Sequence, residues 1–132
     1  MRPADVTAAF VARINEHDLV GLNELMTDDH VFIDALDTRV VGRAAMCSGW
    51  EQYFTLVPDY WIKVDRTLQD DRVVALFGAA GGTYAGGGSG GRKGRWVVPA
   101  AWLAETRDDQ VAMWRVYADN LPLRRLMGVE GT

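Results

Sequence analysis

The second half of the chain holds four long segments rich in β-branched and aromatic residues. Short turn-forming stretches separate them: Gln69-Asp70-Asp71, the glycine tract of residues 86–91, and Arg107-Asp108-Asp109. Consecutive strands joined by such short connections pair as antiparallel hairpins, so this pattern constrains the fold more than any other feature. We expect a four-stranded meander whose strands cover residues 60–68, 72–84, 92–105 and 110–117.

Helical periodicity dominates the first half of the chain. Apolar residues recur at three- and four-residue spacing from Pro3 to Glu16, and again from Leu19 to Met26. A short strand is expected over residues 30–34, and a third helix from Arg43 to about Thr55. Three helices packed on one face of a curved antiparallel sheet make an α+β cone with an internal pocket. Small residues on the inward face would leave that pocket unfilled, and the candidates are Gly78, Ala79, Ala80, Gly81, Ala100 and Ala101.

Length, charge and cysteine content narrow the class of protein. A chain of 132 residues supports one domain, which we expect to span residues 1–132. A formal charge of −4 argues against nucleic acid as a partner, and no run approaches the roughly 18 apolar residues that a membrane span needs. The start of the chain has no signal-peptide pattern, and the single cysteine, Cys47, excludes an internal disulfide. A cytoplasmic location is therefore expected.

Potential metal ligands are few in this sequence. Two histidines, His17 and His30, and Cys47 form no set at metal-binding spacing, so we expect neither a metal nor another cofactor. His17 is expected to face solvent in the turn after the first helix, and His30 to lie on the surface at the edge of a loop. The glycine tract is interpreted as a flexible hairpin connection, with a lid over the pocket as the alternative.

Four segments, in this order and spacing, resemble SnoaL-like polyketide cyclases of the nuclear transport factor 2-like (cystatin-like) superfold. They are Val57-Pro58-Asp59-Tyr60, Asp71-Arg72-Val73-Val74-Ala75, Gly82-Thr83-Tyr84-Ala85-Gly86 and Trp114-Arg115-Val116-Tyr117-Ala118-Asp119. The resemblance covers nearly the whole chain and implies a cone-shaped domain. Members of the superfold include cyclases, isomerases, epoxide hydrolases, dehydratases and non-catalytic domains, so the fold alone names no reaction.

Similarity to the ketosteroid isomerases of this superfold implies a role for one carboxylate. The aspartate that moves the proton in those enzymes matches Asp34. Their oxyanion-hole tyrosine falls at Phe10, and their second acid falls near Ala100, Ala101 or Trp102. The resemblance therefore implies a proton-transfer group without the usual oxyanion hole.

Limonene epoxide hydrolases resemble the chain in its last strand. Their arginine and two aspartates would fall near Gly78, Ala80 and Val116, none of which carries a charge. Epoxide hydrolysis by that apparatus is not expected.

Two aspartates are the candidates for catalysis. Asp34 ends a short apolar strand at the expected mouth of the pocket, where neighbouring aromatic rings would partly desolvate it and suit it to act as a general base. The alternative is that Asp34 caps the turn that follows. Asp119, after the last strand, is a candidate catalytic partner, with a helix cap as its alternative.

Aromatic and apolar side chains from both halves of the chain are expected to line the pocket and to contact a small apolar or aromatic ligand. Core packing or subunit contact is the alternative reading of each tryptophan. The candidates are Phe10, Ile14, Phe32, Trp50, Tyr53, Trp61, Trp102, Trp114 and Val116.

Two functions therefore remain open. The first is an acid–base enzyme of the cyclase, isomerase or lyase type, acting on an apolar carbonyl compound with Asp34 as general base. The second is a non-catalytic ligand-binding or dimeric assembly domain. In both, a homodimer is expected to cover the outer face of the sheet.

Overall fold

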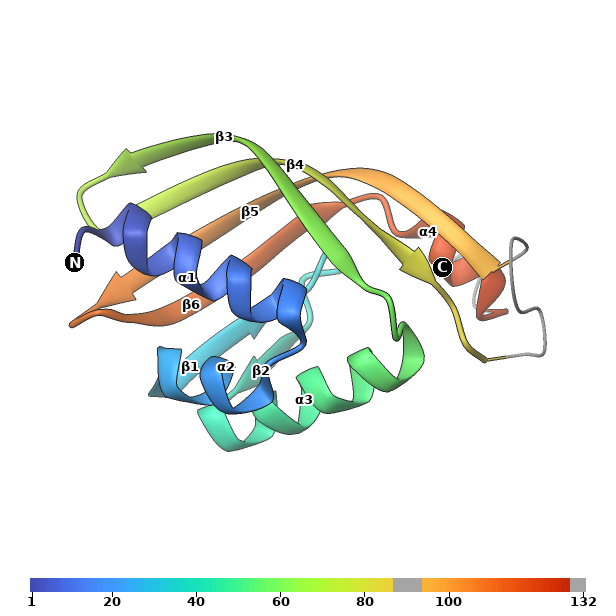
Figure 1. Cartoon of the computed structure of the whole chain (residues 1–132), viewed down its shortest axis with the longest axis horizontal. Coiled ribbons are helices and arrows are strands. Elements are labelled where there is room, and N and C mark those ends of the chain that lie inside the picture. Colours follow the sequence, from blue (N-terminus) through green and yellow to red (C-terminus); the bar gives the residue numbers. More distant parts are fainter. Residues whose placement is uncertain (87–93, 129–132) are drawn as a thin grey trace.

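The computed structural model describes residues 1–86 and 94–128, and these ranges contain four helices and six strands. Figure 1 shows a strongly curved sheet that arches over α1 and α3. Apart from Gly86, the glycine tract lies outside the described residues. The elements are α1 Pro3–Glu16, α2 Leu19–Leu25, β1 Met26–Ile33, β2 Arg39–Val41, α3 Arg43–Leu56, β3 Trp61–Asp70, β4 Val73–Thr83, β5 Arg95–Arg107, β6 Gln110–Ala118 and α4 Leu121–Leu126.

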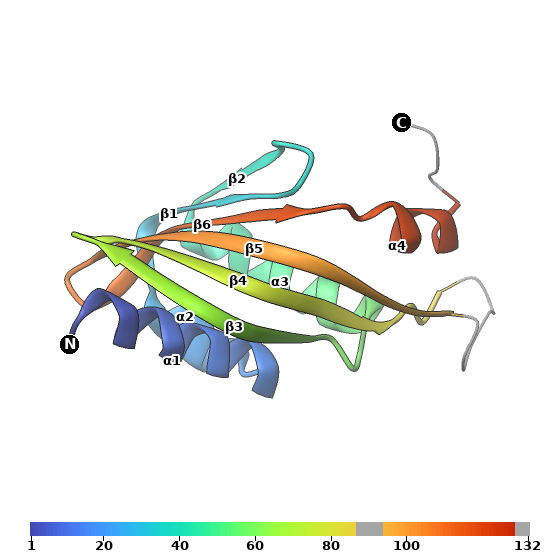
Figure 2. The same cartoon turned by 90° about the horizontal axis from the view of Figure 1, so that it is seen from above.

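The six strands form one sheet in the order β2-β1-β6-β5-β4-β3, with α1, α2 and α3 on one side of it (Figure 2). The predicted α+β class, with helices on a curved sheet, is confirmed. Three details differ from the prediction. The sheet is mixed, because β1 runs parallel to β6 while the other neighbours are antiparallel. It is open, since β2 and β3 are its edges, and a fourth helix, α4, follows β6.

Strand β1 is longer than its local sequence indicates. The prediction gave residues 30–34, whereas the strand begins at Met26, at the end of the apolar stripe assigned to the second helix. Pairing with both β2 and β6 stabilises this extended backbone, and such long-range pairing overrides the local helical pattern. A parallel pair needs a long crossover connection, which here is the whole chain from β2 to β5.

The core lies between the concave face of the sheet and the helices. In β5, alternate side chains from Trp96 to Thr106 are buried, as a strand with one face on a core requires. On α1 the residues Val6, Phe10 and Ile14 form a buried stripe with helical spacing. Burying a side chain such as Phe10 completely contributes about 1.5–3 kcal/mol, so this stripe fixes α1 against the sheet.

The outer strands bend where the register between β3 and β4 shifts, between Val64 and Arg66. Gly78 lies opposite this bulge, and a Cβ atom there would be 1.8 Å from the carbonyl oxygen of Lys63. Only glycine permits this approach of the two backbones, and the bulge increases the local twist. The sheet therefore bends at Gly78.

In the described part of the chain, no helix is long and apolar enough to cross a membrane.

Candidate functional site

An internal cavity of about 280 Å³ lies between α3 and the concave face of the sheet. Side chains from α3, the β1–β2 region, β4, β5, β6 and α4 form its wall. Most of them are apolar, and the polar ones are few. The lining residues are Phe32, Asp34, Ala35, Val40, Met46, Gly49, Trp50, Tyr53, Tyr60, Ala80, Trp96, Val98, Ala100, Trp114, Val116, Ala118, Asn120 and Leu123.

Five of the nine predicted ligand-contacting residues lie on this wall. They are Phe32, Trp50, Tyr53, Trp114 and Val116. The structure brings them together from β1, α3 and β6, although up to 84 positions separate them in sequence, from Phe32 to Val116. Their stacking on a ligand remains a prediction.

The other four predicted residues lie away from the cavity wall. Phe10 and Ile14 are fully buried in the core, where Phe10 packs on Trp114 with ring centroids 5.0 Å apart. Trp102 stacks behind Trp114, with its centroid 6.4 Å away. Trp61 covers the backbone of its strand partner Gly81. These side chains support the wall rather than form it.

Sequence reasoning missed two aromatic residues of the wall, Tyr60 and Trp96. Trp96 has the same facing as Trp102, since both occupy the buried alternation of β5, and that parity was a usable signal. Tyr60 precedes β3 at the end of a turn, where no periodicity indicates its direction.

Small side chains keep the cavity open, but fewer of them face inward than predicted. Ala80 and Ala100 lie on the wall, whereas Gly78, Ala79, Gly81 and Ala101 do not. Consecutive strand residues point to opposite faces of a sheet, so a run such as residues 78–81 cannot all line one pocket. Ala118 on β6 and Gly49 on α3 provide further space.

Asp34 both lines the cavity and holds the turn after β1. Its Oδ1 accepts hydrogen bonds from the backbone N–H groups of Leu36 and Thr38, each at 2.9 Å. Both readings of this residue are therefore compatible with its position. Among the described residues, no group donates a hydrogen bond to Oδ2. One oxygen is committed to the turn and the other is available to a ligand.

Asp119 lies outside the cavity. Its side chain is exposed, and its Oδ1 accepts a hydrogen bond of 3.0 Å from the backbone N–H of Leu121 at the start of α4. This is the capping role weighed as the alternative. The next residue, Asn120, lies on the cavity wall instead.

The two histidines are less exposed than predicted. His17 stacks on Phe54, with ring centroids 4.1 Å apart, and its Nε2 donates to the carbonyl oxygen of Tyr60 at 2.8 Å. His30 is 0% exposed and donates from Nδ1 to the carbonyl oxygen of Val111 at 2.7 Å. The prediction of a surface His30 is wrong, because β6 and α1 cover its ring. His17 is half-buried against α3 rather than simply solvent-facing as predicted.

Burial gives His30 a pH-dependent role in stability. Loss of solvation lowers the pKa of its ring from the usual 6.5, although the hydrogen bond to Val111 and the charge of Asp29 oppose that change. Its Nε2 has no hydrogen-bond partner among the described residues, so the neutral ring is the folded form. The corresponding stability is complete above the unfolded pKa and is lost as the pH falls below it.

We therefore expect the free energy of unfolding to fall when the pH is lowered from about 7.5 to 5.5, by at most about 1.4 kcal/mol per pH unit. Urea unfolding at several pH values measures this slope. In the His30→Gln variant the slope between these values should disappear, and in the His17→Gln variant it should remain. A slope that survives in His30→Gln would assign it to another group.

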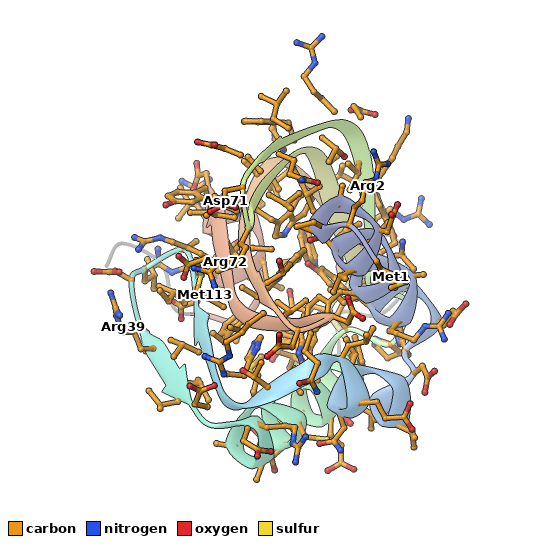
Figure 3. The ribbon with its side chains drawn as sticks, turned by 90° about the vertical axis from the view of Figure 1, so that its left-hand side faces the viewer. Met1, Arg2, Arg39, Asp71, Arg72 and Met113 are labelled. Carbon is orange, nitrogen blue, oxygen red and sulfur yellow. The ribbon has the colours of Figure 1, made fainter. Side chains whose placement is uncertain are left out.

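A second hollow lies on the opposite side of the sheet. It has a volume of about 420 Å³ and is lined by residues of β1, β2, β5 and β6. Figure 3 shows two of them, Arg39 and Met113, on the side of the sheet away from α1. The hydrogen bond and charge of Arg107 lower the pKa of Asp29 in this hollow to about 2, and the two exposed residues form an ion pair. In the described residues no group of three or more His, Cys, Asp or Glu side chains is placed to hold a metal ion.

The chain matches the model of a known family. The model of the SnoaL-like domain matches residues 7–114, which is most of the chain. The chain therefore belongs to the SnoaL-like domain family, as its sequence segments indicated. A search of curated proteins finds no significant match.

Solved structures show the same fold at low sequence identity. A SnoaL-like protein of Shewanella denitrificans OS-217, assigned as a polyketide cyclase, has a TM-score of 0.83 at 14% identity, over 97% of this chain and 98% of that one. IdmH of Streptomyces antibioticus, also assigned as a polyketide cyclase, has a TM-score of 0.79 at 22% identity, over 98% and 100%. An M. tuberculosis epoxide hydrolase of the LEH-like type has a TM-score of 0.78 at 17% identity, over 96% and 91%.

Proposed function

We propose that the protein is an acid–base enzyme for a small, flat carbonyl compound, with the cavity as its active site and Asp34 as its general base. The observation that carries this proposal is a single carboxylate on the wall of a largely apolar, aromatic cavity. The polyketide cyclases among its structural relatives support carbonyl chemistry. Their low identity leaves the reaction to be argued from the site itself.

The proposed chemistry is proton transfer next to a carbonyl. Oδ2 of Asp34 removes a proton from the carbon beside the carbonyl, and the electrons of that C–H bond move into the carbonyl to give an enolate. The hydrogen bonds from Leu36 and Thr38 hold the carboxylate in place during this step. The protonated Asp34 then returns a proton to carbon. An isomerase and a cyclase share the first half of this sequence.

Exchange of hydrogen for deuterium tests the proposal without knowledge of the natural substrate. β-Tetralone, a compact bicyclic ketone, carries exchangeable hydrogens next to its carbonyl. In D₂O at neutral pH, the protein should accelerate their exchange above the buffer rate, measured by proton NMR. No acceleration at a concentration where calorimetry shows β-tetralone bound would refute the enzyme proposal.

That same outcome would favour the second candidate, a non-catalytic binding domain. Its supporting observation is that the positions implied for an oxyanion hole lack the groups of the isomerases: Phe10, in the buried core, replaces the tyrosine, and none of Ala100, Ala101 and Trp102 is an acid. A ligand that binds and is released unchanged would fit this function.

The outer face of the sheet supports a homodimer under either function. Phe77, Ala101 and Tyr117 lie side by side across β4, β5 and β6 on the face opposite the cavity. Phe77 is 43% exposed, Tyr117 48% and Val97, further along β5, 57%. A contiguous exposed apolar surface of this kind marks an interaction site.

We expect a dimer at micromolar concentration in sedimentation velocity. A charge at the centre of this face, in Phe77→Glu, should shift the equilibrium to monomer, because an unpaired charge would be buried in the interface. The control is Val20→Glu on α2, at a position that is also exposed to solvent but on the helical side. A wild-type monomer would contradict the prediction.

The cytoplasmic location remains a prediction of the sequence.

A further inference from the structure

Two tyrosines meet on the wall of the cavity. Tyr53 comes from the last turns of α3, and Tyr60 lies just before β3. Their rings are perpendicular, with centroids 4.9 Å apart, and both side chains line the cavity. Tyr60 is only 9% exposed. The chain thus places two phenol groups together in a largely apolar enclosure.

Neither hydroxyl group forms a hydrogen bond within residues 1–86 and 94–128. The hydrogen bonds that these two residues form in that region use backbone atoms: the carbonyl of Tyr60 accepts from His17, the carbonyl of Tyr53 accepts from the N–H of Val57, and the N–H of Tyr60 donates to Val57. Polar groups in an apolar enclosure almost always have a hydrogen-bond partner. The two hydroxyl groups on the cavity wall are therefore available to a group from outside the described chain.

The hydrogen-bonding groups on this part of the cavity wall indicate which kind of ligand group they can bind. Burial raises the pKa of both phenols well above the usual value, and Tyr53 raises the pKa of Tyr60 further, so both remain neutral donors at physiological pH. Two further wall residues, Trp50 and Trp96, have indole N–H groups without a partner among the described residues. Indole nitrogen donates only, so this aromatic wall is rich in donors and calls for an acceptor.

We propose that the hydroxyl groups of Tyr53 and Tyr60 bind the carbonyl oxygen of the ligand, which makes these residues the specificity determinants for a ketone or quinone over a hydrocarbon of the same shape. The inference rests on the proposed function, in that the cavity must be the ligand site, but it does not require catalysis by Asp34. Two donors on one carbonyl oxygen would also stabilise the enolate charge. Phe10 and Ala100, at positions implied for an oxyanion hole, have side chains that cannot donate a hydrogen bond for this purpose.

A matched pair of probes tests the proposal. β-Tetralone and tetralin have the same two rings and differ in the carbonyl group. Calorimetry at neutral pH should show that the wild-type protein prefers β-tetralone. Tyr53→Phe and Tyr60→Phe should each weaken β-tetralone binding by about two- to tenfold and leave tetralin binding unchanged, since each removes one neutral hydrogen bond. Tyr117→Phe on the outer face is the matched control and should change neither affinity.

The outcomes separate this inference from the function on which it rests. If the wild type binds both probes equally, or if the Tyr53→Phe/Tyr60→Phe double variant keeps its preference, the tyrosine inference is overturned while the cavity remains a ligand site. If the wild type binds neither probe, the proposed function fails and the inference fails with it. The phenylalanine variants break no hydrogen bond of the described chain, so their melting temperatures should equal that of the wild type and serve as the folding control.

Discussion

The Asp34→Asn variant should exchange the hydrogens of β-tetralone at least about a hundredfold more slowly than the wild type, because a positioned general base contributes roughly 10²–10⁴ to the rate. The amide cannot accept the proton. It keeps an oxygen at the position of Oδ1, where it can still accept from the N–H groups of Leu36 and Thr38. The fold should therefore survive, and the loss of rate can be assigned to chemistry.

Two controls complete this experiment. Asp34→Ala removes the turn hydrogen bonds as well and should lower the free energy of unfolding by about 1 kcal/mol, which measures the capping role by itself. Asp119→Asn changes an exposed carboxylate outside the cavity and should keep the wild-type exchange rate. A normal rate in Asp34→Asn would exclude this residue as the base. A slow rate in Asp119→Asn would give that aspartate the catalytic role predicted from the sequence.

The Trp102→Ala variant should lower the free energy of unfolding by about 3–5 kcal/mol, the largest stability effect that we expect from one substitution. The indole is 2% exposed and stacks behind Trp114, so its removal leaves a void against the cavity wall. Domains of this kind have about 5–15 kcal/mol of stability in total, and the variant should unfold at far lower urea concentration. Leu68→Ala, at a position that is 56% exposed, should change the midpoint little.

A second substitution of Trp102 tests whether this residue supports the cavity wall from behind or contacts the ligand. Trp102→Phe keeps part of the stacking surface, so it should fold and should bind β-tetralone as the wild type does. Trp50→Phe, on the cavity wall, should weaken that binding. An equal loss of affinity in both variants would make Trp102 a ligand contact, as the sequence suggested.

Local sequence patterns predicted much of the fold. The three- and four-residue spacing of Val6, Phe10 and Ile14 predicted α1 with its observed bounds, because a helix that buries one face must repeat in this way. The position of Asp34 at the end of a short apolar strand was also visible in the sequence. Its two roles, as turn cap and as cavity carboxylate, were not separable there, since both need only an aspartate beside a turn.

Other features depend on partners that are distant in sequence. The parallel pairing of β1 with β6 and the burial of His30 beneath Val111 arise only when residues some 80 positions apart come together. No periodicity in the local sequence indicates such contacts. The same holds for Tyr60, whose direction is set by its ring contact with Tyr53 rather than by a pattern along β3.

The sequence by itself determined the first three helices, the meander and the supply of aromatic side chains, because hydrophobic periodicity and turn residues act over short distances. The tertiary structure decided which of those aromatic rings face a cavity and which support it from behind. Trp114 and Trp102 illustrate the division: both are tryptophans on buried strand faces, but only Trp114 reaches the cavity. The curvature of the sheet and the placement of α3 make that difference, and both are set by packing across the whole domain.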